Sequence, residues 1–351
     1  MPTLPTKSLP GGTRGELAIL RHIRERAARR PSREIPLGIG DDCAILRPRA
    51  GQDLTVTTDL TVCGTHFRLD WHTPEQAGHR ALARGLSDLA AMGARPIAAF
   101  LSLGLPRDLA QTQSRGPWSR SWPARFLNGL LALAAEYKAQ LAGGDLSETP
   151  VPLADIVLIG AVPQGKALLR SGARPGDLVY VTGSIGGGAA ALPHLDRLAR
   201  ATGAKALGLN PRRIPKGLAP LVARHLAPQP RIAQGIYLRR HELATAAMDL
   251  SDGLSTDLAH LCEESCVAAE IDPALLPVHP GASLDYALHG GDDYELLFTA
   301  AQGVRMPARI GGVAVTRIGR IVRAQRGKPS VTVLSTDGPK PLEPRGWEHF
   351  S

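Results

Sequence analysis

The chain has 351 residues, which is long for a single hydrophobic core and suits two domains. Hydrophobic residues make up 43% and charged residues 21%, as in an ordinary globular protein; without a long apolar run we expect no membrane span and a cytoplasmic protein. The net charge of +9 suits anionic partners such as nucleotides, but only 4% of residues are aromatic, so we expect no nucleic-acid stacking platform.

The N-terminal half is predicted to mix helices and strands. Residues 1–14, rich in proline and glycine, are expected to be a disordered leader. A helix is predicted over 15–30 because its apolar residues share one face. Thr73, with Pro74 behind it, predicts the start of a helix that stops at Gly93. The other predicted elements are strands at 53–58, 97–105 and 156–162, a strand that leads into 143–145, and a helix at 123–138.

A turn-rich segment at 171–177 predicts a domain boundary, which divides the chain into 15–168 and 169–351. The elements predicted beyond it are strands at 178–182, 244–250, 293–299 and 313–322, and helices at 186–200 and 253–264. Strands and helices alternate in both halves. This alternation indicates a mixed α/β or α+β fold and excludes a helical bundle or a β-sandwich.

Aspartates recur at the ends of predicted strands and in glycine-flanked turns. They are Asp41, Asp42, Asp59, Asp145, Asp249, Asp252, Asp292 and Asp293. A single aspartate at a strand end, as Asp59 is expected to be, is usually a cap or turn former. Asp88 differs because it lies within an apolar helical run, where a carboxylate must face water, find a cation or shift its pKa.

Many carboxylates without a His or Cys cluster favour a site for Mg²⁺, which prefers oxygen ligands. Thr57 and Thr58 offer further oxygens beside Asp59. Because Mg²⁺ completes its shell with water and phosphate oxygens, the pattern indicates phosphoryl transfer. The chain has neither a G-x-x-x-x-G-K-[ST] loop nor a protein-kinase catalytic loop. The run 183–188 is glycine-rich and suits either a phosphate cradle or tight-turn packing.

Long motifs, in the same order along the chain, resemble those of bacterial thiamine-monophosphate kinases. They are Gly-Ile-Gly-Asp-Asp-Cys-Ala at 38–44, Thr-Thr-Asp at 57–59, Gly-Thr-His-Phe at 64–67, Leu-Ser-Asp-Leu-Ala-Ala-Met-Gly-Ala at 86–94, Gly-Gly-Asp at 143–145, Arg-Ser-Gly-Ala-Arg-Pro-Gly-Asp at 170–177, Asp-Leu-Ser-Asp-Gly-Leu at 249–254 and Gly-Gly-Asp-Asp-Tyr-Glu-Leu at 290–296. The resemblance spans about Gly15 to the C-terminus.

This resemblance implies a reaction and a fold. The reaction is ATP-dependent phosphorylation of thiamine monophosphate to thiamine diphosphate, by direct transfer with several Mg²⁺ ions and no phosphoenzyme. The fold is the two-domain one shared with aminoimidazole ribonucleotide synthetase and selenophosphate synthetase. Its N-terminal domains pair through their sheets in a homodimer, with the nucleotide near that interface.

The resemblance also implies roles for individual residues. The implied metal ligands are Asp41, Thr57, Thr58, Asp59, Asp88, Asp145, Asp249 and Asp252. The implied ATP contacts are Gly144, Asp145, Arg170 and Ser251, and the implied contacts of thiamine monophosphate are His66, Asp292 and Trp347. The acceptor phosphate is already anionic near neutral pH, so we expect no general base; Asp88 and Arg170 would position charge.

The chain departs from the family pattern at Asp292, where Glu is usual, at Leu127, where many relatives have an aromatic residue, and in the segments 111–122 and 324–339. Three alternatives stay open. One is a synthetase of the same superfamily, although such enzymes commonly carry a reactive N-terminal Cys or Lys and 1–12 offers only Lys7. The others are a homologue without turnover and a basic nucleic-acid-binding protein, which would leave the aspartate motifs unexplained.

Overall fold

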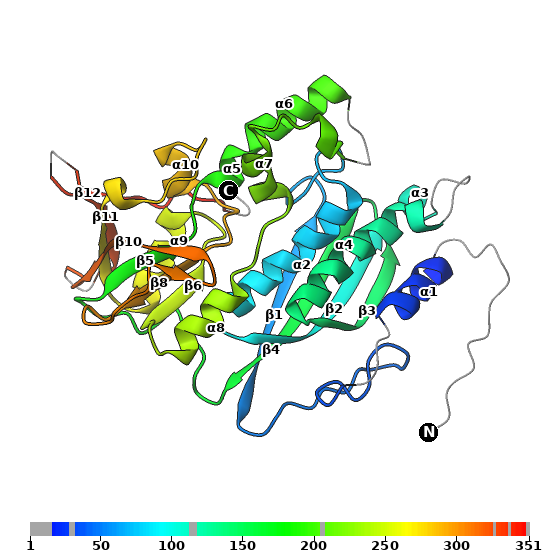
Figure 1. Ribbon diagram of the computed structural model, residues 1–351, viewed down its shortest axis with the longest axis horizontal. Helices are drawn as coiled ribbons and strands as arrows, with labels where there is room; N and C mark the ends of the chain where they lie inside the picture. The colour runs from blue at the N-terminus through cyan, green and yellow to red at the C-terminus, as the bar shows by residue number, and fades with distance from the viewer. Residues whose placement is uncertain are drawn as a thin grey trace.

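The computed structural model describes residues 16–27, 32–111, 118–203, 208–325, 328–335 and 338–348. Two mixed α/β domains lie side by side, the N-terminal one on the right of Figure 1. This arrangement confirms the predicted fold class. The predicted leader 1–14 lies outside the described residues, as do parts of the segments 111–122 and 324–339. Within the described ranges, no helix combines the length and the apolarity that crossing a bilayer requires.

The N-terminal domain is built on a four-stranded mixed sheet. Its strands are β1 (Gln52–Val62), β2 (Arg95–Leu105), β3 (Gln140–Glu148) and β4 (Leu153–Pro163), in the spatial order β1-β4-β2-β3. β2 and β3 run parallel, whereas β4 is antiparallel to both β1 and β2. Side chains alternate along β1, so Thr57 and Asp59 face the covering helices and Thr58 faces the opposite side.

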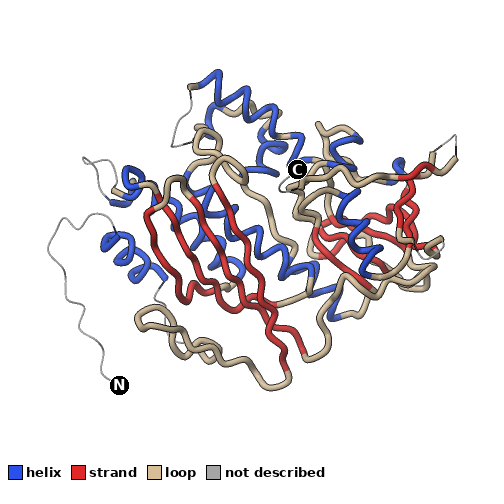
Figure 2. The backbone as a smooth tube through the Cα atoms, turned by 180° about the vertical axis from the view of Figure 1, so that it is seen from behind, coloured by secondary structure: helices blue, strands red, loops and turns tan. Residues whose placement is uncertain are grey.

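Helices cover one face of this sheet and leave the other face open (Figures 1 and 2). The helices of the domain are α1 (Glu16–Ala27), α2 (Pro74–Ala91), α3 (Arg107–Ala110), the 3₁₀ turn η1 (Trp118–Arg120) and α4 (Trp122–Tyr137). Thr73 caps α2 as predicted, because its hydroxyl accepts a hydrogen bond from the Gln76 N–H. α2 and α4 approach so closely that a Cβ on Gly78 would lie 2.0 Å from the Phe126 carbonyl oxygen.

The C-terminal domain carries an eight-stranded sheet in the order β12-β11-β7-β10-β5-β8-β6, with β9 paired to β10. Its strands are β5 (Leu178–Thr182), β6 (Ala246–Asp249), β7 (Ala268–Ile271), β8 (Leu296–Ala300), β9 (Arg309–Ile310), β10 (Val313–Val322), β11 (Ser330–Val333) and β12 (Lys340–Pro341). Its helices are α5 (Gly187–Ala190), α6 (Leu192–Thr202), η2 (Pro211–Arg213), α7 (Ala219–Leu226), α8 (Ile232–Arg240), α9 (Leu254–Glu264), η3 (Pro273–Leu275) and α10 (Leu284–His289).

The largest hydrophobic core runs across the boundary between the domains. It joins Leu86 and Leu89 of α2 to Leu238 of α8 and Phe298 of β8. α8 packs directly on α2, where a Cβ on Gly235 would lie 1.9 Å from the Ala90 carbonyl oxygen. The two halves are therefore held in a fixed relation, and the surfaces that face each other at their junction can share one site.

Several predicted elements are confirmed, and others are corrected. The strands predicted at 178–182 and 313–322 match β5 and β10. The predicted strand end before Asp59 is wrong, because β1 continues to Val62 and Asp59 lies within the strand. Asp145 likewise lies inside β3 instead of at its end. The helix predicted at 186–200 is divided at Ala191 into α5 and α6. Helices α7, α8 and α10 were not predicted.

Candidate active site between the two domains

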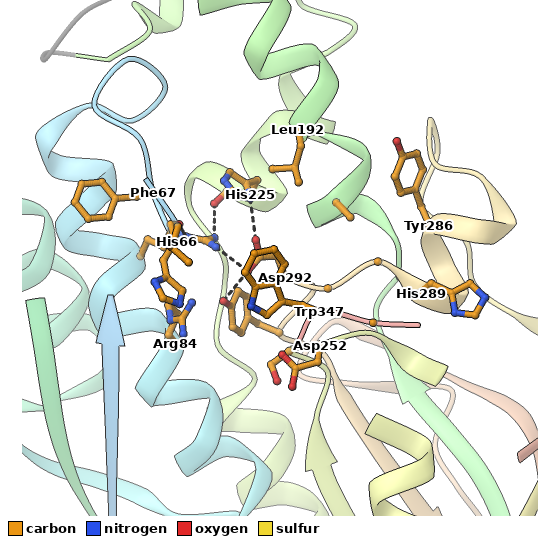
Figure 3. A pocket seen from close by; sticks show the side chains of 18 of the residues that line it. His66, Phe67, Arg84, Leu192, His225, Asp252, Tyr286, His289, Asp292 and Trp347 are labelled. Carbon is orange, nitrogen blue, oxygen red and sulfur yellow. Dashed lines mark hydrogen bonds and ion pairs between the residues drawn. The ribbon is translucent and has the colours of Figure 1, made fainter. Parts of the chain in front are cut away.

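A cavity of about 760 Å³ opens between the two domains, a size typical of small-molecule sites. Loops after β1, the face of α2, the end of β6 and the segment after α10 all contribute to its wall. The structure brings together many residues that the sequence singled out, some of which Figure 3 shows. Those that line the cavity are Asp59, His66, Asp88, Asp249, Ser251, Asp252, Asp292 and Trp347.

Three carboxylates, which we call the carboxylate cluster, come from three different elements: Asp59 from β1, Asp88 from α2 and Asp249 from the end of β6. The hydroxyl of Thr57 donates a hydrogen bond to Asp88. The Ser87 hydroxyl donates to Oδ2 of Asp249 at 2.7 Å, across the domain boundary. All three residues line the cavity, and the charges of Asp249 and Asp59 act on Asp88, so the carboxylates lie near one another.

Ionisation of the carboxylate cluster is unfavourable in the free protein. Burial, and then the neighbouring Asp249, raise the pKa of Asp88 to about 7. Burial also raises the pKa of Asp249, although the Ser87 hydrogen bond and the charge of Arg170 act in the opposite direction. The pKa of Asp59 is raised by burial as well, against the pull of Arg84. The cluster therefore favours a further positive charge.

The donor set fits Mg²⁺ held jointly with a phosphate ligand. Among the described residues, no three His, Cys, Asp or Glu side chains are placed to hold a metal ion by themselves. Mg²⁺ seldom uses such an all-protein cage; it takes one or two carboxylates and completes its shell with waters and phosphate oxygens. Asp59, Asp88 and Asp249, with the hydroxyl of Thr57, supply hard oxygen donors of this kind.

Other predicted site residues lie apart from the cavity wall. Asp41 is in an exposed turn, where its carboxylate accepts the Asp42 N–H at 3.0 Å. Gly144 and Asp145 are on β3, at the edge of the sheet opposite β1. Asp145 shares a row with Leu60 of β1, so both face the open side of the sheet, as the side chain of Thr58 does.

The comparisons with known proteins extend over nearly the whole chain. Residues 40–162 match the family described as AIR synthase related protein, N-terminal domain, and residues 174–331 match its C-terminal domain. The thiamine-monophosphate kinase of Escherichia coli (strain K12) is 39% identical over 350 residues, which cover 96% of this chain and 98% of that protein. The chain belongs to the thiamine-monophosphate kinase family of enzymes.

Solved structures of this family have the same fold. The thiamine-monophosphate kinase of Stenotrophomonas maltophilia K279a is 38% identical, with a TM-score of 0.75 over 91% of this chain and 96% of that one. Another structure, AaThiL complexed with AMPPCP and TMP, is 31% identical, with a TM-score of 0.70 over 96% of this chain and 97% of that one. The confirmed family agrees with the resemblance drawn from the sequence motifs.

Asp292 is held tightly by its neighbours. Its Oδ1 accepts hydrogen bonds from Arg80 at 2.7 Å and from the Tyr294 hydroxyl at 2.8 Å. The Nδ1 of His225 lies 3.1 Å from Oδ2. Burial acts to raise the pKa of Asp292, but Arg80 and the other partners hold it well below its usual range.

His66 of the N-terminal domain and Trp347 of the C-terminal domain both reach the cavity (Figure 3). His66 lies in the tight turn after β1, and its Nδ1 accepts the Val62 N–H at 3.1 Å. Trp347 is 55% exposed at the rim, where its backbone N–H donates to the Asp252 carbonyl oxygen at 3.0 Å. Both side chains therefore stand where a ligand in the cavity can contact them.

Two arginines of α2 belong to the site, although the sequence motifs did not single them out. Arg84 forms an ion pair with Asp59, with Nη2 2.8 Å from Oδ1, and Arg80 binds Asp292. Arg80, Arg84 and Asp88 are spaced by four residues and so share one face of the helix. Three charged side chains on one face of an otherwise apolar helix were the signal that could have identified this wall of the cavity.

The glycine-rich run at 183–188 does not line this cavity. Two of its amides are already occupied, because the buried carboxylate of Asp293 accepts the N–H of Gly186 at 2.6 Å and that of Gly188 at 3.2 Å. Burial raises the pKa of Asp293 to about 7. Of the two interpretations drawn from the sequence, the structure favours tight-turn packing over a phosphate cradle.

Proposed function

We propose that this protein transfers the terminal phosphoryl group of ATP directly to thiamine monophosphate, forming thiamine diphosphate and ADP with the help of Mg²⁺. The observation that carries this proposal is the convergence of Asp59, Asp88 and Asp249 in a cavity that His66 also lines. Relatives that match nearly the whole chain are named thiamine-monophosphate kinases. One solved relative is complexed with TMP and with AMPPCP, an analogue of ATP.

The chemistry that this site must perform is mainly charge neutralisation and alignment. Mg²⁺, when bound by the carboxylate cluster, would neutralise phosphate charge and orient phosphate oxygens. Arg84 and Arg170 bring positive charge close to the same carboxylates. A phosphate acceptor is already ionised near neutral pH, so these residues need to bind and orient the substrates but not to remove a proton.

The remaining predicted contacts are proposals of the same kind. Ser251 and Asp252 follow β6 and line the cavity beside Asp249, which suits contacts with ATP and a further metal ion. Trp347 at the rim suits stacking on an aromatic ring of the thiamine substrate. Gly144 and Asp145 lie on β3 beyond the cavity wall, and Asp145 faces the open side of the sheet, so their proposed role with ATP requires a nucleotide that reaches this open side.

The test is direct. The purified protein is incubated with ATP, Mg²⁺ and thiamine monophosphate, and thiamine diphosphate and ADP are measured together. We expect equimolar formation of both products, dependence on Mg²⁺, and no product with thiamine in place of its monophosphate. ADP without thiamine diphosphate would overturn the proposed substrate, and no ADP under any Mg²⁺ concentration would overturn the proposed reaction.

We also propose that the protein is a homodimer paired through the open face of its N-terminal sheet. Leu54, Val56 and Leu60 of β1 point to this face and are 41%, 63% and 49% exposed. No helix of the described chain covers it (Figure 2). Apolar side chains in a row on an uncovered sheet are typical of an interface, and a second copy offers a matching face.

The mass in solution tests this pairing. We expect light scattering to give the mass of a dimer for the natural protein and of a monomer for Val56→Asp, because a carboxylate at the interface would be buried without a partner. Leu275→Asp, which places the same charge at an exposed apolar position of the other domain, should leave the dimer intact. A monomeric natural protein would refute the proposal.

A further inference from the structure

Arg80 is a fully buried cation in the middle of α2. Its side chain is 1% exposed, and its guanidinium donates hydrogen bonds in three directions. Nε donates to the His66 carbonyl oxygen at 2.7 Å, Nη1 to the His225 carbonyl oxygen at 2.8 Å, and Nη2 to Oδ1 of Asp292 at 2.7 Å. No step of the proposed reaction requires this group, so its burial calls for another explanation.

The three partners of Arg80 belong to three segments that are far apart in the sequence. His66 is in the turn after β1, His225 is in the last turn of α7, and Asp292 is in the loop before β8. The last carbonyls of a helix lack intrahelical partners, so a cation at the end of α7 satisfies one of them. A single side chain of the N-terminal domain thus joins its own turn to two segments of the C-terminal domain.

The loop that carries Asp292 needs such support. Asp292 has a φ of 68° and Tyr294 a φ of 50°, both in the left-handed region that non-glycine residues seldom adopt. The Tyr294 hydroxyl donates to the same Oδ1 atom that Arg80 contacts. This costly backbone conformation is held by two backbone hydrogen bonds, from the Asp292 N–H to Ser251 and from the Tyr294 N–H to Leu250, both 2.8 Å long. The contacts of the Asp292 carboxylate with Arg80 and the Tyr294 hydroxyl add to them and fix the side chain.

We propose that Arg80 is a positioning residue, which sets the distance between the His66 turn and the Asp292 loop and thereby shapes the part of the cavity that receives thiamine monophosphate. This inference rests on the proposed function. Arg80 makes no hydrogen bond to the carboxylate cluster, whose members bind Thr57, Arg84 and Ser87 instead, and its charge acts on Asp59 only behind that of Arg84. Arg80 therefore acts on the thiamine substrate more than on ATP, and Asp292 acts in part as its counter-ion.

The shape of the side chain is essential to this role. A guanidinium presents its donors in a rigid planar fork, whereas an ammonium concentrates them on one nitrogen. The acceptors of Arg80 lie around three different nitrogens, so lysine can keep the charge but cannot reach all of them. Arg80→Lys therefore separates the effect of charge from that of geometry, and Arg80→Met removes both.

Steady-state kinetics with each substrate varied in turn provide the test. For both Arg80→Met and Arg80→Lys we expect the KM for thiamine monophosphate to rise about tenfold or more, since bonds to a charged donor are lost, while the KM for ATP changes less than about twofold. The matched control is Arg125→Met, which removes an arginine of α4 that pairs with Glu75 away from the cavity. It should change neither KM.

A double-mutant cycle tests the pair independently of turnover. Asp292→Asn keeps the size of the side chain but removes the charge, and we expect the thermal destabilisation by Arg80→Met and Asp292→Asn to be far from additive in the double variant. If Arg80→Met does not fold, Arg80→Lys and Asp292→Asn supply the kinetic comparison.

The outcomes separate this inference from the proposed function. A natural protein that forms no thiamine diphosphate refutes the proposed function. A natural protein that turns over, together with Arg80 variants whose KM for thiamine monophosphate is unchanged, refutes the positioning role alone. Equal rises in both KM values also refute it, since they would indicate a general structural effect.

Discussion

Replacing Asp88 by asparagine should make the free protein more stable at alkaline pH and almost inactive. Asp88 lies buried on α2 beside Asp249, and its pKa is raised from 3.8 to about 7. Each unit of pKa shift corresponds to about 1.4 kcal/mol, so the ionised carboxylate costs the folded state about 4 kcal/mol. Asparagine has almost the same shape but carries no charge.

The direction of the pH dependence follows from the raised pKa. A carboxyl group whose pKa is higher in the folded state adds stability that is complete below pH 3.8 and is lost as the pH rises through about 7. Asparagine does not ionise, so the stability of Asp88→Asn does not fall for this reason over this pH range. We therefore expect the variant to exceed the natural protein in stability by up to about 4 kcal/mol at pH 8, and the difference to vanish near pH 4.

Thermal unfolding without divalent cations, from pH 4 to pH 8, measures this difference. Adding Mg²⁺ with AMPPCP should stabilise the natural protein much more than Asp88→Asn, and kcat of the variant should fall by orders of magnitude. Asp108→Asn, at an exposed position of α3, is the control and should match the natural protein throughout. Equal stability at pH 8, or near-natural turnover in saturating Mg²⁺, would contradict the reasoning.

Three further predictions concern the same site and its support. Asp59→Asn should lower kcat at least about a hundredfold in saturating Mg²⁺ without unfolding the protein; near-natural turnover would show that Asp59 holds no metal. His66→Ala should raise the KM for thiamine monophosphate and leave that for ATP unchanged, and equal rises would refute a specific role. Gly78→Ala should lower the free energy of unfolding by about 1–3 kcal/mol or more, because α2 must move away from Phe126, whereas Gly217→Ala, with open space around it, should be tolerated in denaturant titrations.

Local patterns were enough to predict much of the fold. The proline and threonine at the start of α2 identified its first turn, and the apolar runs of β5 and β10 gave their full extent. The end of β1 was misplaced because Asp59 disfavours a strand by itself. In the folded protein the pairing of β1 with β4 continues to Val62 and overrides that local preference.

The sequence predicted those site residues whose side chains are chemically unusual for their local surroundings. Asp88 stood out because a carboxylate in an apolar helix needs a partner; the structure supplies the hydroxyl of Thr57, whereas the like charge of the neighbouring Asp249 raises the pKa of Asp88. The links of Arg80 to His225 and Asp292 could not be predicted, since they join segments more than a hundred residues apart. Such contacts depend on how the two domains dock, which no local pattern encodes.

The hydrophobic core that crosses the domain boundary determines how the protein unfolds. Leu168, at the end of the first half, already packs in the same core as Phe298 of β8. A chain cut between residues 168 and 169 would expose apolar surface on both fragments, so we expect neither to fold alone and the intact protein to melt in a single cooperative transition. Synthesis of the second half thus decides when the first half becomes stable.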